Sequence, residues 1–178
     1  MAGLRRFSQA ISEGDGISLI VDVHSLEEAR SAQSRGAEGV ALRERLDGVR
    51  DATELPILWL RPGTPEEAVQ GGADAYLFAD LEDERLEELH AQALDLGLDC
   101  VIEVRDEEEL ELALERLDPE IVLLTGEDAE AVLDLLPDVP AGKLAIAEAR
   151  QASPEVIAEL ERAGVDAVLV GDVAPAQT

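Results

Sequence analysis

Strand-like and helix-like segments alternate along almost the whole of this sequence, and this alternation constrains the fold more than any other feature. Amphipathic, mostly acidic segments typical of helices separate short runs of aliphatic residues typical of buried strands. These runs fall at 17–23, 39–43, 56–60, 75–79, 100–104, 120–125, 143–147 and 165–170. Strands that alternate with helices predict βαβ units and a parallel sheet.

Eight such units favour a closed (β/α)8 TIM barrel over an open doubly wound sheet. The open sheet remains the alternative, because 178 residues is short for such a barrel. We expect a lead-in over 1–16 and a single barrel domain over 17–178. Residues 173–178 are too few for a full helix, so the last helix is expected to be missing or truncated. A homodimer that covers the resulting gap in the outer wall is one hypothesis.

Helix starts and ends are marked by residues with a specific backbone role. Ser25, Thr64, Asp106 and Ser153 each stand where a capping side chain would accept a hydrogen bond from the first turn. The pattern Gly-x-Asp recurs at 72–74, 97–99 and 164–166, always where a helical segment gives way to a strand. We therefore predict a structural role for these glycines and aspartates.

The chain is strongly acidic: 41 Asp and Glu residues against 14 Lys and Arg residues give a net charge of −27. A nucleic-acid partner is not expected, because a phosphate backbone needs a basic footprint on the protein. Acidic residues are spread over nearly every expected helix. This pattern is typical of proteins from high-salt cytoplasms or from GC-rich genomes, and the sequence does not separate the two causes.

Several classes of protein are not supported by the sequence. No apolar run is long enough to span a membrane, and no apolar stretch follows the two N-terminal arginines as it would in a secretion signal. We therefore expect a cytoplasmic protein with no membrane partner. No Gly-x-Gly-x-x-Gly follows the first strand, and no His or Cys pair has the spacing of metal ligands, so we expect neither a cofactor nor a metal.

The core must be built mainly from Leu, Val, Ile and Ala, because aromatic residues make up only 2% of the chain. The single cysteine, Cys100, lies in an apolar strand and is expected to be a buried core residue rather than a nucleophile. Trp59 and Phe78 are expected to pack between barrel and helices rather than against a ligand.

The stretch 99–114 points to a site. Its apolar strand is interrupted by a single carboxylate, Glu103. An ionised carboxylate in an apolar strand is costly unless it has a partner, and Arg105, two residues further on the same strand face, is the expected one. Active sites of parallel barrels lie at the carboxyl ends of the strands, so Glu103 is a candidate site residue.

Further polar residues follow the strands at the same end and would ring one mouth of a barrel. One interpretation is a ligand site with Glu103 as base or anchor, His24 as acid or base, and Arg150 as an anion contact. The other is a solvated rim of paired Arg and Glu residues, left from an enzyme ancestor. The full set is Asp22, His24, Glu44, Arg61, Asp80, Glu103, Arg105, Thr125, Glu148, Arg150 and Asp172.

Several blocks of the sequence resemble the indole-3-glycerol phosphate synthase family. The segments at 72–78 (GADAYLF) and 93–106 (ALDLGLDCVIEVRD) are similar to the family's GADAxLL and ALGLxxLVEVHD. The segments at 55–58 (LPIL) and 164–171 (GVDAVLVG) are similar to its LPVL and GxDAVLVG. The segment at 17–24 (ISLIVDVH) stands where the family has xxIAEVK. Together these blocks span most of residues 17–172, and the resemblance implies a TIM barrel.

The resemblance also implies a carbon–carbon lyase of tryptophan biosynthesis, which closes the ring of a carboxyphenylamino-deoxyribulose phosphate with decarboxylation and dehydration. That reaction implies a lysine general acid, a carboxylate that handles protons, and a phosphate cradle. By position, the family's strand-1 Glu and Lys fall on Asp22 and His24, and its strand-5 Glu on Glu103. These three are the candidate catalytic residues. The candidate ligand or phosphate contacts are Thr125, Arg150 and Gly171.

Other family positions hold different residues in this chain. The family's strand-3 Lys falls on Leu60, and the Ser-Gly of its phosphate site falls on Ala149 and Arg150. Lys143, the only lysine, precedes the seventh strand and is expected at the opposite, amino-terminal end of the barrel. Two functions therefore stay open. One is a synthase-like enzyme acting on a phosphorylated small molecule, and the other is a non-catalytic barrel that binds a small anion or another protein.

Overall fold

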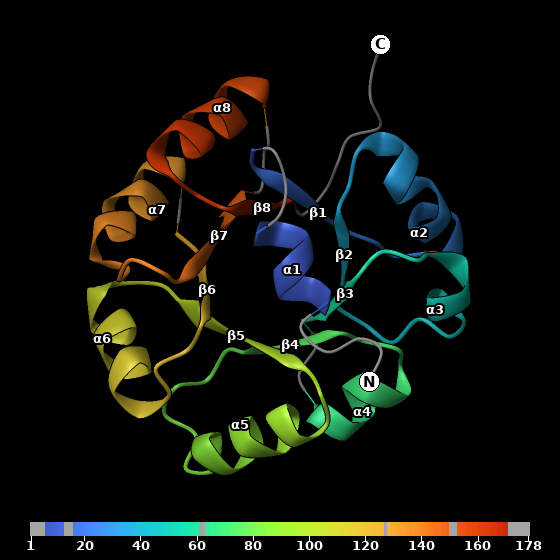
Figure 1. Cartoon of the computed structure of the whole chain (residues 1–178), viewed down its shortest axis with the longest axis horizontal. Helices are drawn as coiled ribbons and strands as arrows, with labels where there is room; N and C mark the ends of the chain where they lie inside the picture. The colour runs from blue at the N-terminus through green and yellow to red at the C-terminus, as the bar shows by residue number, and fades with distance from the viewer. Residues whose placement is uncertain (1–5, 13–15, 61–62, 127, 150–152, 171–178) are drawn as a thin grey trace.

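Eight parallel strands close into a barrel in which every strand pairs with its neighbours in the sequence and β8 pairs with β1 (Figure 1). The computed structural model describes residues 6–12, 16–60, 63–126, 128–149 and 153–170. Closure is direct, because β1 pairs with β8 from Ser18 with Ala167 to Val21 with Val170. The predicted TIM barrel is therefore confirmed, and the open sheet is excluded.

The strands fall close to the predicted apolar runs. Their bounds are β1 Ser18–Asp22, β2 Gly39–Leu42, β3 Ile57–Trp59, β4 Ala75–Phe78, β5 Asp99–Val104, β6 Ile121–Leu124, β7 Leu144–Ala149 and β8 Ala167–Val170.

The helices are short, and α2 to α8 surround the barrel as a ring (Figure 1). Their bounds are α1 Arg6–Ser12, α2 Leu26–Ala32, α3 Val49–Ala52, α4 Pro65–Gln70, α5 Leu86–Asp95, α6 Glu107–Arg116, α7 Ala129–Leu135 and α8 Pro154–Ala163. The 3-10 turns η1 Gln33–Arg35 and η2 Leu136–Asp138 extend α2 and α7. Every predicted cap is confirmed, since Ser25, Thr64, Asp106 and Ser153 each accept a hydrogen bond from the first turn.

Helix α1 closes the amino-terminal end of the barrel, and Figure 1 shows it at the centre of the ring of strands. Its Phe7 and Ile11 are buried in one cluster with the inward-facing side chains of the strands. The backbone N–H of Ser8 donates to Asp99 Oδ2 at 2.9 Å, at the start of β5. The sequence analysis treated this segment only as a lead-in and did not anticipate the helix.

The recurring Gly-x-Asp pattern has the predicted structural role. Asp74 Oδ2 accepts the backbone N–H of Ile57 at 2.9 Å, and Asp166 Oδ2 accepts that of Ala145 at 2.9 Å. In both cases the aspartate precedes one strand and binds the start of the strand before it. The third copy, Asp99, binds α1 instead. The same motif therefore fixes the strand starts at two places and the closing helix at a third.

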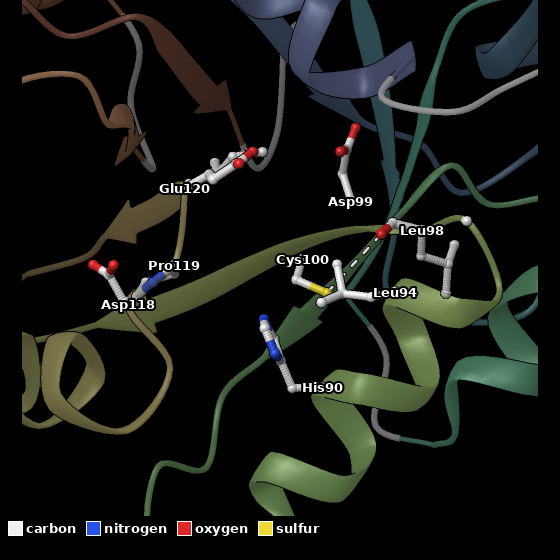
Figure 2. Close-up of a pocket in the computed structure, with 10 residues that line it drawn as sticks. His90, Leu94, Leu98, Asp99, Cys100, Asp118, Pro119 and Glu120 are labelled. Carbon is white, nitrogen blue, oxygen red and sulfur yellow. Dashed lines mark hydrogen bonds between the residues drawn. The ribbon is translucent and has the colours of Figure 1, made fainter.

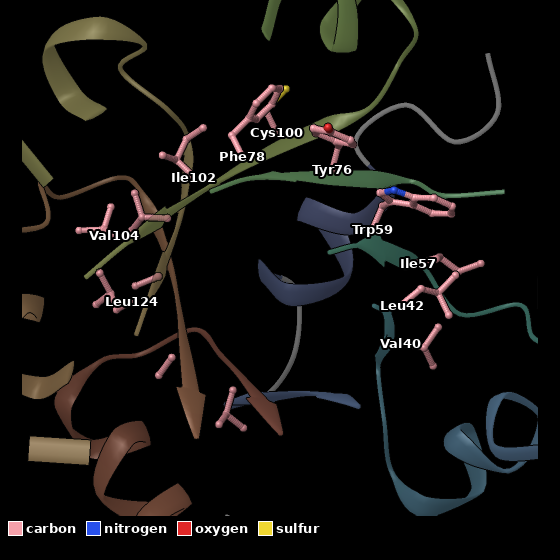
Figure 3. Packing of buried hydrophobic residues seen from close by; sticks show 14 of the residues in the cluster. Val40, Leu42, Ile57, Trp59, Tyr76, Phe78, Cys100, Ile102, Val104 and Leu124 are labelled. Atoms are coloured by element: carbon pink, nitrogen blue, oxygen red, sulfur yellow. The ribbon is translucent and has the colours of Figure 1, made fainter. Parts of the chain in front are cut away.

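The apolar core has two layers, one inside the barrel and one between the strands and the helices. Figure 3 shows the outer layer, in which Trp59, Tyr76 and Phe78 project from β3 and β4 away from the barrel axis. The Tyr76 and Phe78 rings meet edge to face with centroids 4.8 Å apart. Cys100 is buried in the same layer. The expected packing of Trp59, Phe78 and Cys100 is confirmed.

The outer face where β8 meets β1 is largely covered. Val21, Val168 and Val170 are buried there, and Leu19 is half-buried. Residues 171–178, in which the last helix was expected to be missing or truncated, lie outside the described residues. The homodimer across this seam stays a prediction. Among the described residues, none of the helices has the length and apolar character needed to cross a membrane.

The position of Phe7 leads to a stability prediction. Its side chain is fully buried, so Phe7→Ala should lower the free energy of unfolding by about 3–5 kcal/mol, as expected for a large core residue. Urea denaturation measures this change. The matched control on the same helix is Ser12→Ala, an exposed position that should change stability by less than about 0.5 kcal/mol. Equal, small effects of both substitutions would show that α1 does not close the barrel.

Candidate functional site

The inward-facing rows of the barrel end in polar residues at the carboxy-terminal mouth. Each lies two positions beyond a residue of the inner core cluster, and alternate residues of a strand share one face. The polar residues in these positions are Asp22 in β1, Arg43 after β2, Glu103 in β5, Thr125 after β6 and Glu148 in β7.

Four of these residues form one hydrogen-bonded chain across the mouth. Arg43 Nε lies 2.5 Å from Asp22 Oδ2, and Arg43 Nη2 lies 3.0 Å from Glu148 Oε2. The Thr125 hydroxyl donates to Glu148 Oε1 at 2.8 Å. The network thus links the ends of β1, β2, β6 and β7. The sequence analysis missed Arg43, although its position two residues after the inward Ala41 could have indicated it.

Asp22 is the most deeply buried ionisable group of the mouth. Only 2% of its side chain is exposed, and Oδ1 has no hydrogen-bond partner in the described part of the chain. Burial raises the pKa of the Asp22 carboxyl, and the Arg43 hydrogen bond opposes this in smaller measure. His24 Nε2 lies 4.0 Å from Oδ1, while the His24 side chain is half exposed. The structure therefore brings together two of the three predicted catalytic residues.

Glu103 belongs to a separate ion pair. Arg105 binds Glu103 Oε2 through Nη2 at 2.9 Å and through Nε at 3.2 Å, so the predicted pairing is confirmed. The hydrogen bonds that Arg105 donates to Glu103 raise the pKa of Arg105. No hydrogen bond joins Glu103 to Asp22 or His24 among the described residues. The three predicted catalytic residues thus share one mouth but form two groups.

The two residues that bear on the family's lysine chemistry, Leu60 and Lys143, bring no amine to the mouth. Leu60, which follows β3, is half-buried and packs against the inner core cluster. Lys143 lies at the amino-terminal end of the barrel, as predicted. Its Nζ donates to Asp118 Oδ1 at 2.8 Å and to the Pro119 carbonyl at 2.6 Å, just before β6. The only lysine of the chain is therefore held away from the mouth.

The remaining candidates contribute less to the described mouth. Glu44 is exposed, and Asp80 accepts the Glu82 backbone N–H at 3.0 Å in a turn. Four candidates lie outside the described residues: Arg61, Arg150, Gly171 and Asp172. Across the described ranges, no group of three or more His, Cys, Asp or Glu side chains could hold a metal ion.

Comparisons with known sequences agree on one family. A family model for indole-3-glycerol phosphate synthase matches residues 43–177. A protein of that name from Geobacillus sp. (strain WCH70) is 30% identical over 174 residues, which are 85% of this chain and 67% of the relative. One from Acidithiobacillus ferrooxidans (strain ATCC 53993 / BNL-5-31) is 36% identical over 139 residues, which are 71% of this chain and 53% of the relative. This chain thus spans between 53% and 67% of the length of these two relatives.

Comparisons with solved structures confirm the fold. A mutant tryptophan synthase α-subunit from Pyrococcus furiosus superposes with a TM-score of 0.72 at 16% identity, over 86% of each chain. A putative phosphonomutase from Burkholderia cenocepacia J2315 superposes with a TM-score of 0.66 at 17% identity, over 93% of this chain and 92% of that one. At these identities the likeness concerns the barrel alone.

The Asp22–Arg43 pair leads to a pH-dependent prediction. Arg43→Gln removes the positive charge that stabilises the buried, ionised Asp22. The variant should therefore lose about 1–3 kcal/mol of stability at pH 7.5. Because the pKa of Asp22 is raised in the folded state, its ionisation costs stability as the pH rises through 3.8 and then through the folded pKa. In the variant this cost is larger, so the loss relative to wild type should shrink as the pH falls and Asp22 becomes protonated.

Urea denaturation at several pH values measures both chains. Arg45→Gln is the matched control, because among the described residues Arg45 pairs only with the exposed Asp47, at 3.0 Å, and its loss should change stability little at any pH. A loss in Arg43→Gln that stays constant with pH would contradict the role given to Asp22.

Proposed function

Because this chain belongs to the indole-3-glycerol phosphate synthase family, we propose that it uses the family's barrel to bind a small anionic molecule and does not catalyse the family's ring closure. The observation that carries the proposal is the composition of the mouth. Its described cations are two guanidinium groups, Arg43 and Arg105, and both are held by inward-facing carboxylates.

The acid–base chemistry of arginine supports the proposal that this chain does not catalyse the ring closure. By resemblance, the family reaction uses a lysine ammonium as general acid. A guanidinium stays protonated throughout the physiological pH range and does not deliver a proton. The carboxylates that bind Arg43 and Arg105 raise their pKa values further. Neither arginine can therefore stand in for a catalytic lysine, and Leu60 brings no proton at all.

The same cations support binding of an anion. A guanidinium carries five N–H donors. Arg43 places Nε and Nη2 on carboxylates, and its side chain remains 46% exposed at the mouth. The rest of the guanidinium can thus hold a phosphate or carboxylate, next to the Thr125 hydroxyl that bonds to Glu148 in the same network. Arg150 and Gly171 belong to the same proposal as further contacts.

A second candidate function is residual proton transfer by Asp22 and His24. The observation that favours it is the buried Asp22 Oδ1, which has no hydrogen-bond partner among the described residues and lies 4.0 Å from His24 Nε2. A carboxyl with a raised pKa beside an imidazole is typical of acid–base sites. Under this alternative the chain keeps slow turnover, and His24→Ala abolishes it.

An assay of indole-3-glycerol phosphate formation from the carboxyphenylamino-deoxyribulose phosphate separates the two candidates. We expect no turnover above that of an Asp22→Ala/Glu103→Ala double variant, in low and in high salt. A family relative that carries both lysines serves as the positive control. Turnover well above the double variant that is lost in His24→Ala would overturn the proposal in favour of the second candidate.

A further inference from the structure

We propose that His24 couples anion binding at the mouth to the uptake of a proton, so that the mouth binds its anion more tightly as the pH falls. The coupling rests on the anion site proposed above and adds the condition under which that site is filled. It follows from the place of His24 beside the network of Asp22, Arg43 and Glu148. The ligand is then a small anion that binds together with a proton.

The network at the mouth has more negative than positive charge. Arg43 binds both Asp22 and Glu148, so one guanidinium faces two carboxylates. Burial raises the pKa of the Asp22 carboxyl, and the charge of Glu148 adds to this effect. An anion that binds to Arg43 therefore approaches a group whose net charge is already negative. Tight binding of the anion needs a further positive charge close to it.

His24 is placed to supply that charge. Its Nε2 lies 4.0 Å from Asp22 Oδ1, while Arg43 binds the other oxygen of the same carboxylate. Oδ1 itself has no hydrogen-bond partner in the described part of the chain. The side chain of His24 is 47% exposed, against 2% for Asp22. Of these two groups, His24 is therefore the one that a proton from solvent and an anion can both reach.

The charged groups around His24 determine what a proton on its ring would meet. Glu28 on α2 accepts the His24 backbone N–H at 2.9 Å, and Asp22 and Glu148 bring the carboxylates of the network. These carboxylates attract an imidazolium, and Arg43 repels it. An anion bound beside Arg43 adds negative charge and so draws a proton from solvent onto the imidazole. The protonated ring then has two N–H donors instead of one.

Linkage gives the sign of the pH dependence. Histidine side chains change charge between about pH 5 and pH 8. If the anion-bound state holds more protons than the free state, the affinity for the anion rises as the pH falls through this range. At pH 6 an anion meets more of the imidazolium form than at pH 8. One added charge at a half-exposed position should strengthen binding by about fivefold.

An NMR titration of the ¹⁵N-labelled protein with sulfate tests the coupling. Sulfate remains a dianion throughout this pH range, so a pH dependence of its binding comes from the protein. At constant ionic strength, we expect the affinity for sulfate to be about fivefold higher at pH 6 than at pH 8. At pH 7, addition of sulfate should move the ring signals of His24 toward their protonated positions. The chain has 2 histidines, so the assignment of these signals is simple.

The second histidine, His90, is the internal control. It lies on α5 and lines a cavity of about 280 Å³ beside the starts of β5 and β6, at the amino-terminal end of the barrel (Figure 2). Figure 2 shows its ring between Pro119 and Cys100, whereas the mouth lies at the other ends of the strands. Sulfate should leave the ring signals of His90 unchanged. His90→Gln should keep both the affinity and the pH dependence of the wild type.

Two substitutions of His24 separate its charge from its other contacts. His24→Gln is never charged, so it should bind sulfate at pH 6 and at pH 8 as weakly as the wild type does at pH 8. His24→Arg is always charged, so it should bind at both pH values as tightly as the wild type does at pH 6. Both variants should fold, because the position is half exposed.

The outcomes separate the proton coupling from the anion site on which it rests. Equal sulfate binding at pH 6 and pH 8 in the wild type would overturn the coupling and leave the anion site standing. The same holds if His24→Gln keeps the full pH dependence, since the proton would then go to another group. If sulfate binds at neither pH, the anion site is wrong and the coupling falls with it.

Discussion

The arrangement of the mouth depends on the pairing of inward-facing carboxylates with guanidinium groups. A barrel interior is a poor place for an ionised carboxylate, because water is excluded and the charge must be compensated locally. Asp22 meets this constraint through Arg43, which reaches on to Glu148, and Glu103 meets it through Arg105. The same pairs that allow the carboxylates to be buried also fix the positions of the two guanidinium groups at the mouth.

The carboxylates at the two ends of the barrel are compensated by different kinds of partner. At the amino-terminal end, aspartates of the Gly-x-Asp motif accept backbone N–H groups, and α1 fills the opening with Phe7 and Ile11. At the carboxy-terminal end, side chains pair with side chains. Backbone contacts give a fixed, structural closure, while the paired arginines keep further N–H groups that can hold a ligand. This difference explains why we place the anion site at the mouth.

The sequence was enough to predict the barrel, since periodicity, caps and the Gly-x-Asp pattern are local and all agree. It also indicated the Glu103–Arg105 pair, because the two residues are two apart on one strand. It did not indicate the Arg43–Glu148 contact, which joins positions 105 residues apart through a long side chain. Helix α1 was missed because its seven residues give too short a pattern to separate from a loop. The cavity beside α5 could not be predicted, because its lining comes from one helix end and two strand starts at once.

The central claim is that Arg43 compensates the buried charge of Asp22. The most direct measurement is a titration of the Asp22 side-chain carboxyl by ¹³C NMR, in the wild-type chain and in Arg43→Gln. We predict a pKa above 3.8 in the wild type, because burial outweighs the ion pair, and a clearly higher pKa in the variant. The same pKa in both chains, or a lower one in the variant, would contradict the account.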